Sequence, residues 1–356
     1  MIFHPPISVQ KTRSINLALA ASSSLIEIGS IVALIQEHAN LLSVLLAGLS
    51  YQFGNALARP VPSNPIASAC VAGIGAIALF FSPVGSFIWF AGLAALSWGL
   101  QTTRRCLSII AYNAQPSTAQ KRMARVGGFI VSTMLPFTTS VIITTSLCLI
   151  VAIPQRRYRL IPAETRNNSI SAQVHPIHAM MVVHQMHYFS YCYAVPVIFA
   201  ANNFEENWLI GVWFALGWIS YLSVHWTLQR FRLEWVFVIG HVFVATTLIS
   251  LSFFAGVAHL AIAMWILTGF GGGTVFCLSE LNKHFGLGDE LLVKYEDIGH
   301  IGGIALAVTV VALTKLTAGD LPLVAAALAL MASIGMTTWS IRRRNDVTST
   351  TSQLTP

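Results

Sequence analysis

Long apolar stretches recur along almost the whole chain and are separated by short polar segments. A helix needs about 20 mostly apolar residues to cross the hydrocarbon layer of a membrane. Stretches of about that length or longer lie at residues 14–36, 40–58, 64–82, 84–103, 122–153, 176–201, 206–228, 235–255, 258–278, 297–316 and 320–341. The pattern therefore predicts an all-α integral membrane protein.

One of these stretches, residues 122–153, is too long for a single crossing. As one straight helix it would run about 48 Å, whereas the hydrocarbon core is about 30 Å thick. Pro136 lies near its middle, and proline breaks a helix interior. We therefore expect two spans here, which brings the total to twelve.

Basic residues occupy alternate gaps between the predicted spans. Cytoplasmic loops are enriched in Lys and Arg, so this distribution places both termini in the cytoplasm. Of the 20 Lys and Arg residues, only Lys315 departs from the scheme. The first stretch is longer than the apolar region of a secretory signal, and we expect it to be retained as the first span.

Composition supports a membrane protein and narrows its functions. Hydrophobic residues make up 55% of the chain and charged residues 9%, against about 25% charged in soluble domains. The net charge of +7 fits loops beside an anionic lipid leaflet rather than a nucleic-acid partner. The five cysteines show no paired spacing, and no nucleotide-binding motif is present. We expect neither an enzyme nor a resident cofactor.

The chain shows signs of an internal duplication. An offset of 171 residues, or slightly more, aligns short matches at equivalent places in two halves. The matches are Arg59 with Arg230, Cys106-Leu107-Ser108 with Cys277-Leu278-Ser279, and Gly127-Gly128 with Gly302-Gly303. The prediction is a six-helix half at 1–153, a cytoplasmic linker at 154–175, a second six-helix half at 176–341 and a cytoplasmic tail at 342–356.

This organisation resembles the major facilitator superfamily, whose members consist of two six-helix halves. Gly54 and Arg59 keep the spacing of the family motif between spans two and three, although Ala58 replaces its aspartate. The resemblance implies a transporter similar to proton-coupled efflux members. It also implies that Arg59 and Arg230 belong to cytoplasmic loops that help to latch the halves.

Glu27 is the clearest candidate for chemistry. It lies 13 residues past Ser14, which is about 20 Å along a helix and near the middle of the membrane. Ionisable residues at such depth are costly and usually functional. Burial favours the protonated carboxyl, so we expect Glu27 to take up and release protons. Antiporters of the superfamily often keep an acid in this helix, which the position resembles.

The start of span seven carries a second candidate group. His184, His187, Tyr188 and Tyr191 follow helical spacing and share one face, and His187 lies at about the depth of Glu27. We expect His187 to assist proton coupling and this face to bind substrate. Two histidines without nearby carboxylates rarely complete a metal site, so a dedicated metal site formed by this helix alone is not expected.

Other polar residues in the spans are supporting candidates. Gln101 and Tyr51 are assigned to substrate binding, with Gln52 and His241 as further embedded polar groups. Glu296, Asp297 and His300 form a possible cytoplasmic gate, although acids also favour helix starts, and that interpretation is preferred. Gly269–Gly273 is interpreted as close packing or a hinge.

The leading hypothesis is a secondary transporter of the cell inner (plasma) membrane. It would act as a monomer and export an amphipathic or metal-chelating compound, similar to a siderophore, in exchange for protons. One alternative is direct passage of a divalent metal ion through His184 and His187. Another is a membrane redox protein whose histidines ligate haem or iron.

Overall fold

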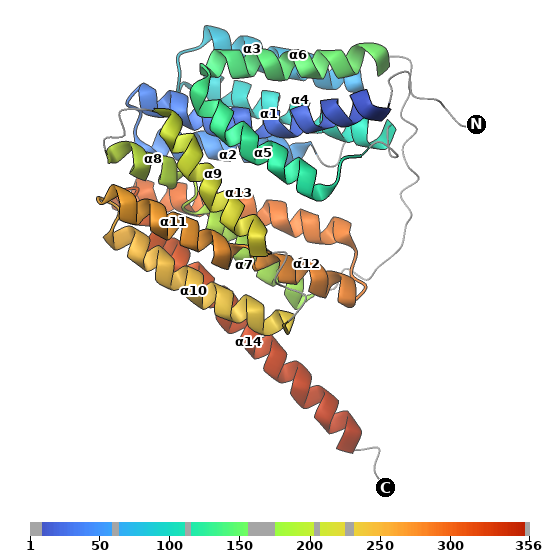
Figure 1. Cartoon of the computed structure of the whole chain (residues 1–356), viewed down its shortest axis with the longest axis vertical. Helices are drawn as coiled ribbons and strands as arrows, with labels where there is room; N and C mark the ends of the chain where they lie inside the picture. Colours follow the sequence, from blue (N-terminus) through green and yellow to red (C-terminus); the bar gives the residue numbers. More distant parts are fainter. Residues whose placement is uncertain are drawn as a thin grey trace, which may run out of the picture. The chain divides into compact units, whose positions relative to one another are not determined.

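The structure, a computed structural model, describes residues 9–58, 64–110, 115–155, 175–202, 207–224 and 231–352. The described residues are helical throughout, apart from short connections (Figure 1). The helices of the first part are α1 (Val9–Gln36), α2 (Leu41–Leu57), α3 (Pro65–Phe81), α4 (Phe87–Ile110), α5 (Thr118–Met134) and α6 (Phe137–Gln155). Those of the rest are α7 (Pro176–Phe189), α8 (Ala194–Ala201), α9 (Asn207–Ser223), α10 (Leu233–Phe253), α11 (Ala258–Gly272), α12 (Val275–His284), α13 (Asp289–Thr314) and α14 (Leu321–Ser352).

Short polar residues set several helix starts. Asn40 accepts a hydrogen bond from the backbone N–H of Ser43 at 2.9 Å and so caps α2. Ser117 and Gln120 form a reciprocal capping box at the start of α5. Such caps satisfy backbone donors that have no partner within the helix. They give these two helices defined starts close to their predicted spans.

The predicted break in the long fifth stretch is confirmed. α5 ends at Met134 and α6 begins at Phe137, on either side of Pro136. Two further breaks were not predicted. One separates α7 from α8 at residues 190–193, in the turn that precedes Pro196 of α8, where the proline ring opposes a regular helix. The other separates α11 from α12 at Gly273 and Thr274.

The described helices have the character of membrane spans. Five are long and apolar enough to cross a membrane, and four shorter helices are also apolar. Phe81 and Phe87 are each 86% exposed and Leu313 is 79% exposed. Such side chains are stabilised by lipid, since water would oppose their exposure. The chain is a multi-pass membrane protein, while twelve crossings and cytoplasmic termini stay predictions.

The chain divides into two compact units. The first contains α1 to α6 and Asn207–Ala215 of α9, and the second contains α7, α8, the rest of α9 and α10 to α14. Residues 156–174 of the predicted linker lie outside the described residues. In the second unit, α14 continues to Ser352, so the predicted tail begins as a continuation of this helix (Figure 1). The predicted six-helix halves stay predictions.

Helix pairing inside the second unit repeats that inside the first. In the first unit, α1 packs on α5 and α6, and α3 packs on α4 and α6. In the second, α7 packs on α13 and α14, and α10 packs on α11 and α14. In the numbering of the predicted spans, the first unit pairs span one with five and six, and span three with four and six. The second unit pairs span seven with eleven and twelve, and span nine with ten and twelve. The repetition supports the duplication inferred from the sequence matches.

The two glycine pairs used to align the halves also occupy equivalent places. A Cβ atom at Gly128 of α5 would collide with the carbonyl oxygen of Ala21 in α1. A Cβ atom at Gly303 of α13 would collide with the backbone of Met186 in α7. In both units the glycine therefore lets the fifth span approach the first span of that unit closely.

Candidate functional site

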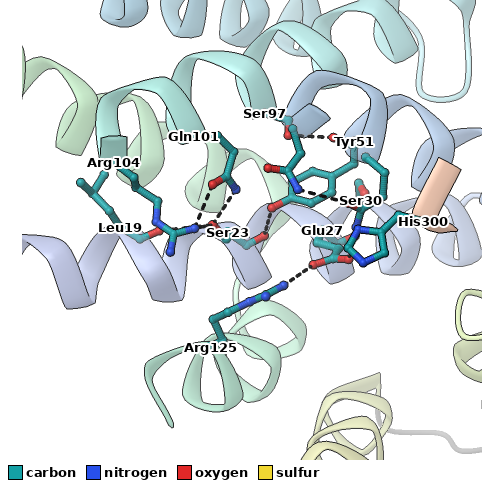
Figure 2. A network of polar contacts seen from close by, with 12 residues as sticks. Leu19, Ser23, Glu27, Ser30, Tyr51, Ser97, Gln101, Arg104, Arg125 and His300 are labelled. Carbon is teal, nitrogen blue, oxygen red and sulfur yellow. Dashed lines mark hydrogen bonds and ion pairs between the residues drawn. The ribbon is translucent and has the colours of Figure 1, made fainter. Parts of the chain in front are cut away.

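Glu27 is the centre of a polar network in the first unit (Figure 2). It is 6% exposed and lies among small residues of α1, which leave room for side chains from neighbouring helices. Gln52 of α2 donates its Nε2–H to Glu27 Oε1 at 3.0 Å. Arg125 of α5 places Nη2 3.2 Å from Glu27 Oε2. Three helices thus meet at one buried carboxylate.

A second group of contacts surrounds Ser23, one turn before Glu27. The Tyr51 hydroxyl donates to the carbonyl oxygen of Ser23 at 3.0 Å. Gln101 of α4 donates to Ser23 Oγ at 3.1 Å, and Arg104 donates to the same oxygen at 3.0 Å. Arg104 also donates to Gln101 Oε1 at 2.9 Å. The structure therefore brings Glu27, Tyr51 and Gln101 into one network, as Figure 2 shows.

The charges of this network do not cancel. Even with Glu27 ionised, the network holds one negative charge against the two positive charges of Arg104 and Arg125. Among the described residues, no carboxylate oxygen lies within 4.0 Å of Arg104. A partly buried guanidinium favours an anionic partner, which it can bind with two parallel hydrogen bonds. The first unit therefore offers a proton acceptor beside a potential anion-binding group.

Sequence reasoning did not select Arg104 and Arg125 as site residues, because it counted both among the basic residues between spans four and five. The structure places both within helices, where they contact α1, and the side of the membrane on which they lie stays a prediction. For Arg125, the signal was the capping box at Ser117 and Gln120, which starts α5 two turns before the arginine. For Arg104, the signal was the lack of any helix breaker after Gln101, since α4 continues to Ile110.

The histidines of α7 form a cluster in the second unit. His184 and His187 meet His241 of α10, and one ring nitrogen of each lies within 4.8 Å of the others. All three residues are buried, at 2%, 1% and 0% exposed. His184 Nδ1 lies 2.8 Å from His241 Nε2. The sequence singled out the α7 pair and named His241 only as an embedded polar residue, without connecting the two helices.

Tyr188 and Tyr191, which follow His187 along the chain, line a small aromatic pocket. Tyr188 stacks on Trp265, with ring centroids 6.4 Å apart, and Tyr191 meets the same ring edge-on at 6.0 Å. The remaining lining residues are Gly217, Trp218, Tyr221, Thr268, Gly269 and Gly272. Aromatic walls with few polar groups are typical of sites for amphipathic ligands. The role of this pocket in substrate binding stays a prediction.

The glycine-rich segment beside this pocket is a close-packing element. A Cβ atom at Gly269 would collide with Ser220 and Gly217 of α9, and one at Gly271 would collide with Val244 of α10. Of the two interpretations of Gly269–Gly273, close packing is the one that these contacts support. The glycines hold α11 near the helices that carry the pocket.

The acidic group on α13 does not mark a helix start. α13 begins at Asp289, so Glu296, Asp297 and His300 lie two to three turns inside the helix, and the helix-start interpretation is wrong. His300 Nε2 lies 3.8 Å from Glu296 and its Nδ1 lies 4.0 Å from Asp297. Gln185 of α7 donates to Glu296 Oε1 at 3.4 Å. These residues connect α13 to α7, and a gating role stays a prediction.

The structure does not test the two predicted loop arginines or the predicted joint site of Glu27 and His187. Arg59 and Arg230 lie outside the described residues. The prediction that Glu27 and His187 serve one site joins residues of different units, so it stays a prediction.

Comparison with known proteins identifies the fold. No protein-family model matches the sequence, and no curated protein matches it closely enough to be counted as a relative. The solved structure of the nucleoside transporter NupG matches with a TM-score of 0.65 at 14% identity, over 93% of this chain and 98% of that one. A bacterial homologue of the iron transporter ferroportin, in the inward-facing state, matches with a TM-score of 0.61 at 16% identity, over 94% and 100%.

A third match is a POT family transporter in complex with 5-aminolevulinic acid. It has a TM-score of 0.64 at 11% identity and covers 93% of this chain and 96% of that one. At such identities the likeness establishes the fold alone. The chain shares the fold of these solved transporters, and its membership of the superfamily that the sequence resembles stays a prediction.

Proposed function

We propose that the chain is a proton-coupled secondary transporter of the inner (plasma) membrane that exports a small molecule by alternating access. The observation that carries this proposal is the buried Glu27 carboxylate, held between Gln52 and Arg125, with Arg104 bound to Ser23 one turn earlier on α1. The fold shared with solved transporters supports the class of function.

The carboxylate of Glu27 can accept either a proton or a donor group of the substrate. When the two compete for the same oxygens, binding of one releases the other, which is the requirement for exchange. Arg125 balances the charge of Glu27 between these events. The proton therefore moves in the direction opposite to the substrate.

The neighbouring groups indicate the class of substrate. Arg104 suits a carboxylate or another anionic group because its partners Ser23 and Gln101 are neutral. In the first unit, Tyr51 and Gln101 provide further hydrogen-bonding groups, and a compound with both amine and carboxylate groups fits this network. Separately, the aromatic pocket at Tyr188 and Tyr191 of the second unit suits a compound with an apolar part. Metal-chelating compounds of the siderophore type are of this kind.

The test compares three kinds of cells by untargeted mass spectrometry of medium and cell extract. The cells lack the chain, carry it, or carry Glu27→Gln, each grown with and without metal limitation. We expect one compound to leave the medium and accumulate inside the cells in both defective strains. Glu27→Gln keeps the side-chain shape and removes proton exchange, so its phenotype should match the absence of the chain.

Glu37→Gln is the matched control, because Glu37 lies just past the end of α1 and is exposed. Cells with this variant should export as the unaltered cells do. An identical distribution of compounds in all strains would reject the exporter. Loss of export in both variants would show that the effect is not specific to the buried carboxylate.

A further inference from the structure

The cluster of His184, His187 and His241 has the arrangement of a metal site. Two of its histidines come from adjacent turns of α7 and the third comes from α10. Their ring centroids are separated by 4.8, 5.0 and 5.5 Å. Three imidazoles whose rings already lie this close together can surround one ion without moving either backbone far.

Hydrogen bonding determines which nitrogen of His241 is available. Its Nδ1 lies 2.8 Å from the carbonyl oxygen of Phe237. A carbonyl oxygen only accepts, so Nδ1 carries the proton, and in the neutral ring Nε2 has a free lone pair. That lone pair faces His184 Nδ1 at 2.8 Å. Histidines that ligate metals commonly donate the other ring N–H to a backbone carbonyl in this way.

His187 adds an unsatisfied group to the cluster. Its Nδ1 is buried and has no hydrogen-bond partner of good geometry within the described part of the chain, and only the backbone of His184 interacts weakly with the ring. A buried polar atom without a partner costs about 1–3 kcal/mol, so an interior histidine of purely structural role would be expected to acquire one. The phenyl ring of Phe237, 3.9 Å from the His241 ring between centroids, makes the surroundings apolar. A bound cation, which accepts the lone pairs of several nitrogens, would give these buried ring nitrogens a partner.

We propose that His184, His187 and His241 bind a divalent transition-metal ion of the zinc type. Three neutral imidazoles with a fourth position left open are a known coordination for Zn²⁺, and imidazole also suits Cu²⁺ and Ni²⁺. With metal–nitrogen distances of about 2.0–2.1 Å, tetrahedral ligands are about 3.3 Å apart. The 2.8 Å pair must therefore separate by roughly half an ångström, which small side-chain rotations can supply.

Binding also requires one proton to move. In the metal-free cluster, His184 donates its Nδ1–H to His241 Nε2. To ligate through Nδ1, His184 carries this proton on Nε2 instead, and its net charge does not change. The ion takes the place of the shared proton between the two rings.

This site does not depend on the proposed proton exchange. All three histidines belong to the second unit, whereas Glu27 and its partners belong to the first. A failure of the export experiment would leave metal binding untouched, and a failure to bind metal would leave export through Glu27 untouched.

The test measures zinc bound to the purified full chain in detergent, with an affinity tag that contains no histidine. After equilibration with Zn²⁺ and removal of loosely bound ions, metal analysis should find about one zinc per chain. His187→Gln and His241→Gln should each bind at least tenfold more weakly. With Co²⁺ as a coloured substitute, the unaltered chain should show the absorption of tetrahedral cobalt and the variants should not.

His259→Gln is the control, because His259 is an exposed histidine of the same unit. It should bind zinc as the unaltered chain does. His187→Gln is the most informative variant, since the other two histidines are hydrogen-bonded to each other and their loss can disturb folding. Absence of zinc from the folded unaltered chain, or equal binding by His187→Gln, would overturn the proposal.

Discussion

At the scale of single residues, the ion pair between Glu27 and Arg125 is the most consequential contact. The two side chains are unequally buried. Counting side-chain atoms alone, 8% of the Glu27 surface and 31% of the Arg125 surface are exposed. A buried carboxylate that loses its cation is costly, because water cannot replace the lost interaction. A guanidinium that can still reach polar surroundings loses less. The pair should therefore respond asymmetrically to substitution.

We predict that Arg125→Gln destabilises the protein more than Glu27→Gln does. Stranding the carboxylate should cost about 2–4 kcal/mol, and stranding the guanidinium should cost less. The double variant should recover part of the loss, with a coupling free energy of about 1–3 kcal/mol. Denaturant unfolding in detergent, followed by tryptophan fluorescence, measures all three. Strictly additive losses would contradict a direct interaction.

At the scale of helices, glycines decide how closely the first and fifth spans of each unit approach. Gly128 and Gly303 lie against backbone atoms of α1 and α7, whereas their neighbours do not. A Cβ at Gly127 would meet nothing within 4 Å, and one at Gly302 would only reach the flexible side chain of Met186 at 3.5 Å. Each unit thus contains its own matched control.

We predict opposite effects of alanine at adjacent glycines. Gly128→Ala and Gly303→Ala should lower the free energy of unfolding by about 1–3 kcal/mol, because the helices must separate. Gly127→Ala and Gly302→Ala should leave it unchanged or raise it by up to about 1 kcal/mol, because alanine favours the helix. Thermal unfolding of the four variants is sufficient. Equal effects within either pair would show that the close approach is not decisive.

Gly128→Ala should also weaken export, because displacement of α1 from α5 separates Glu27 from Arg125. Lower stability and weaker export in the same variant would connect the packing of α1 on α5 to the proposed proton exchange at Glu27. A variant that is less stable but exports normally would place the ion pair outside the transport step.

At the scale of the whole molecule, the predicted topology can be tested directly. Twelve crossings with cytoplasmic termini place Glu37 and Lys315 outside and Lys11 and Lys283 inside. All four residues are exposed, so a cysteine at each is accessible to a reagent on its own side. Cys70 is exposed and must first be replaced, whereas the other four cysteines are buried.

We predict that a membrane-impermeant thiol reagent labels Glu37→Cys and Lys315→Cys in intact cells. Lys11→Cys and Lys283→Cys should react only after the membrane is permeabilised. The physical reason is that positive charge resists translocation. Labelling of Lys11→Cys or Lys283→Cys in intact cells would refute the twelve-span arrangement.

The sequence by itself determined where the helices lie and what type of fold they form. The length and hydropathy of a span, its polar caps and a proline such as Pro136 act within a few residues, so they can be recognised without the fold. The same reasoning identified Glu27 and His184, because an ionisable group inside an apolar stretch is conspicuous on its own. Local signals did not reveal that α4 continues beyond its apolar part, and Arg104 in this continuation was therefore not selected as a site residue.

Only the tertiary structure decided which polar groups meet. Arg125 lies 98 residues from Glu27, and His241 lies 57 residues from His184. Hydropathy describes each span separately and does not say which of its faces meets which neighbour. That choice depends on close packing between helices, such as the contact of Gly128 with α1, and packing is a property of the assembled unit.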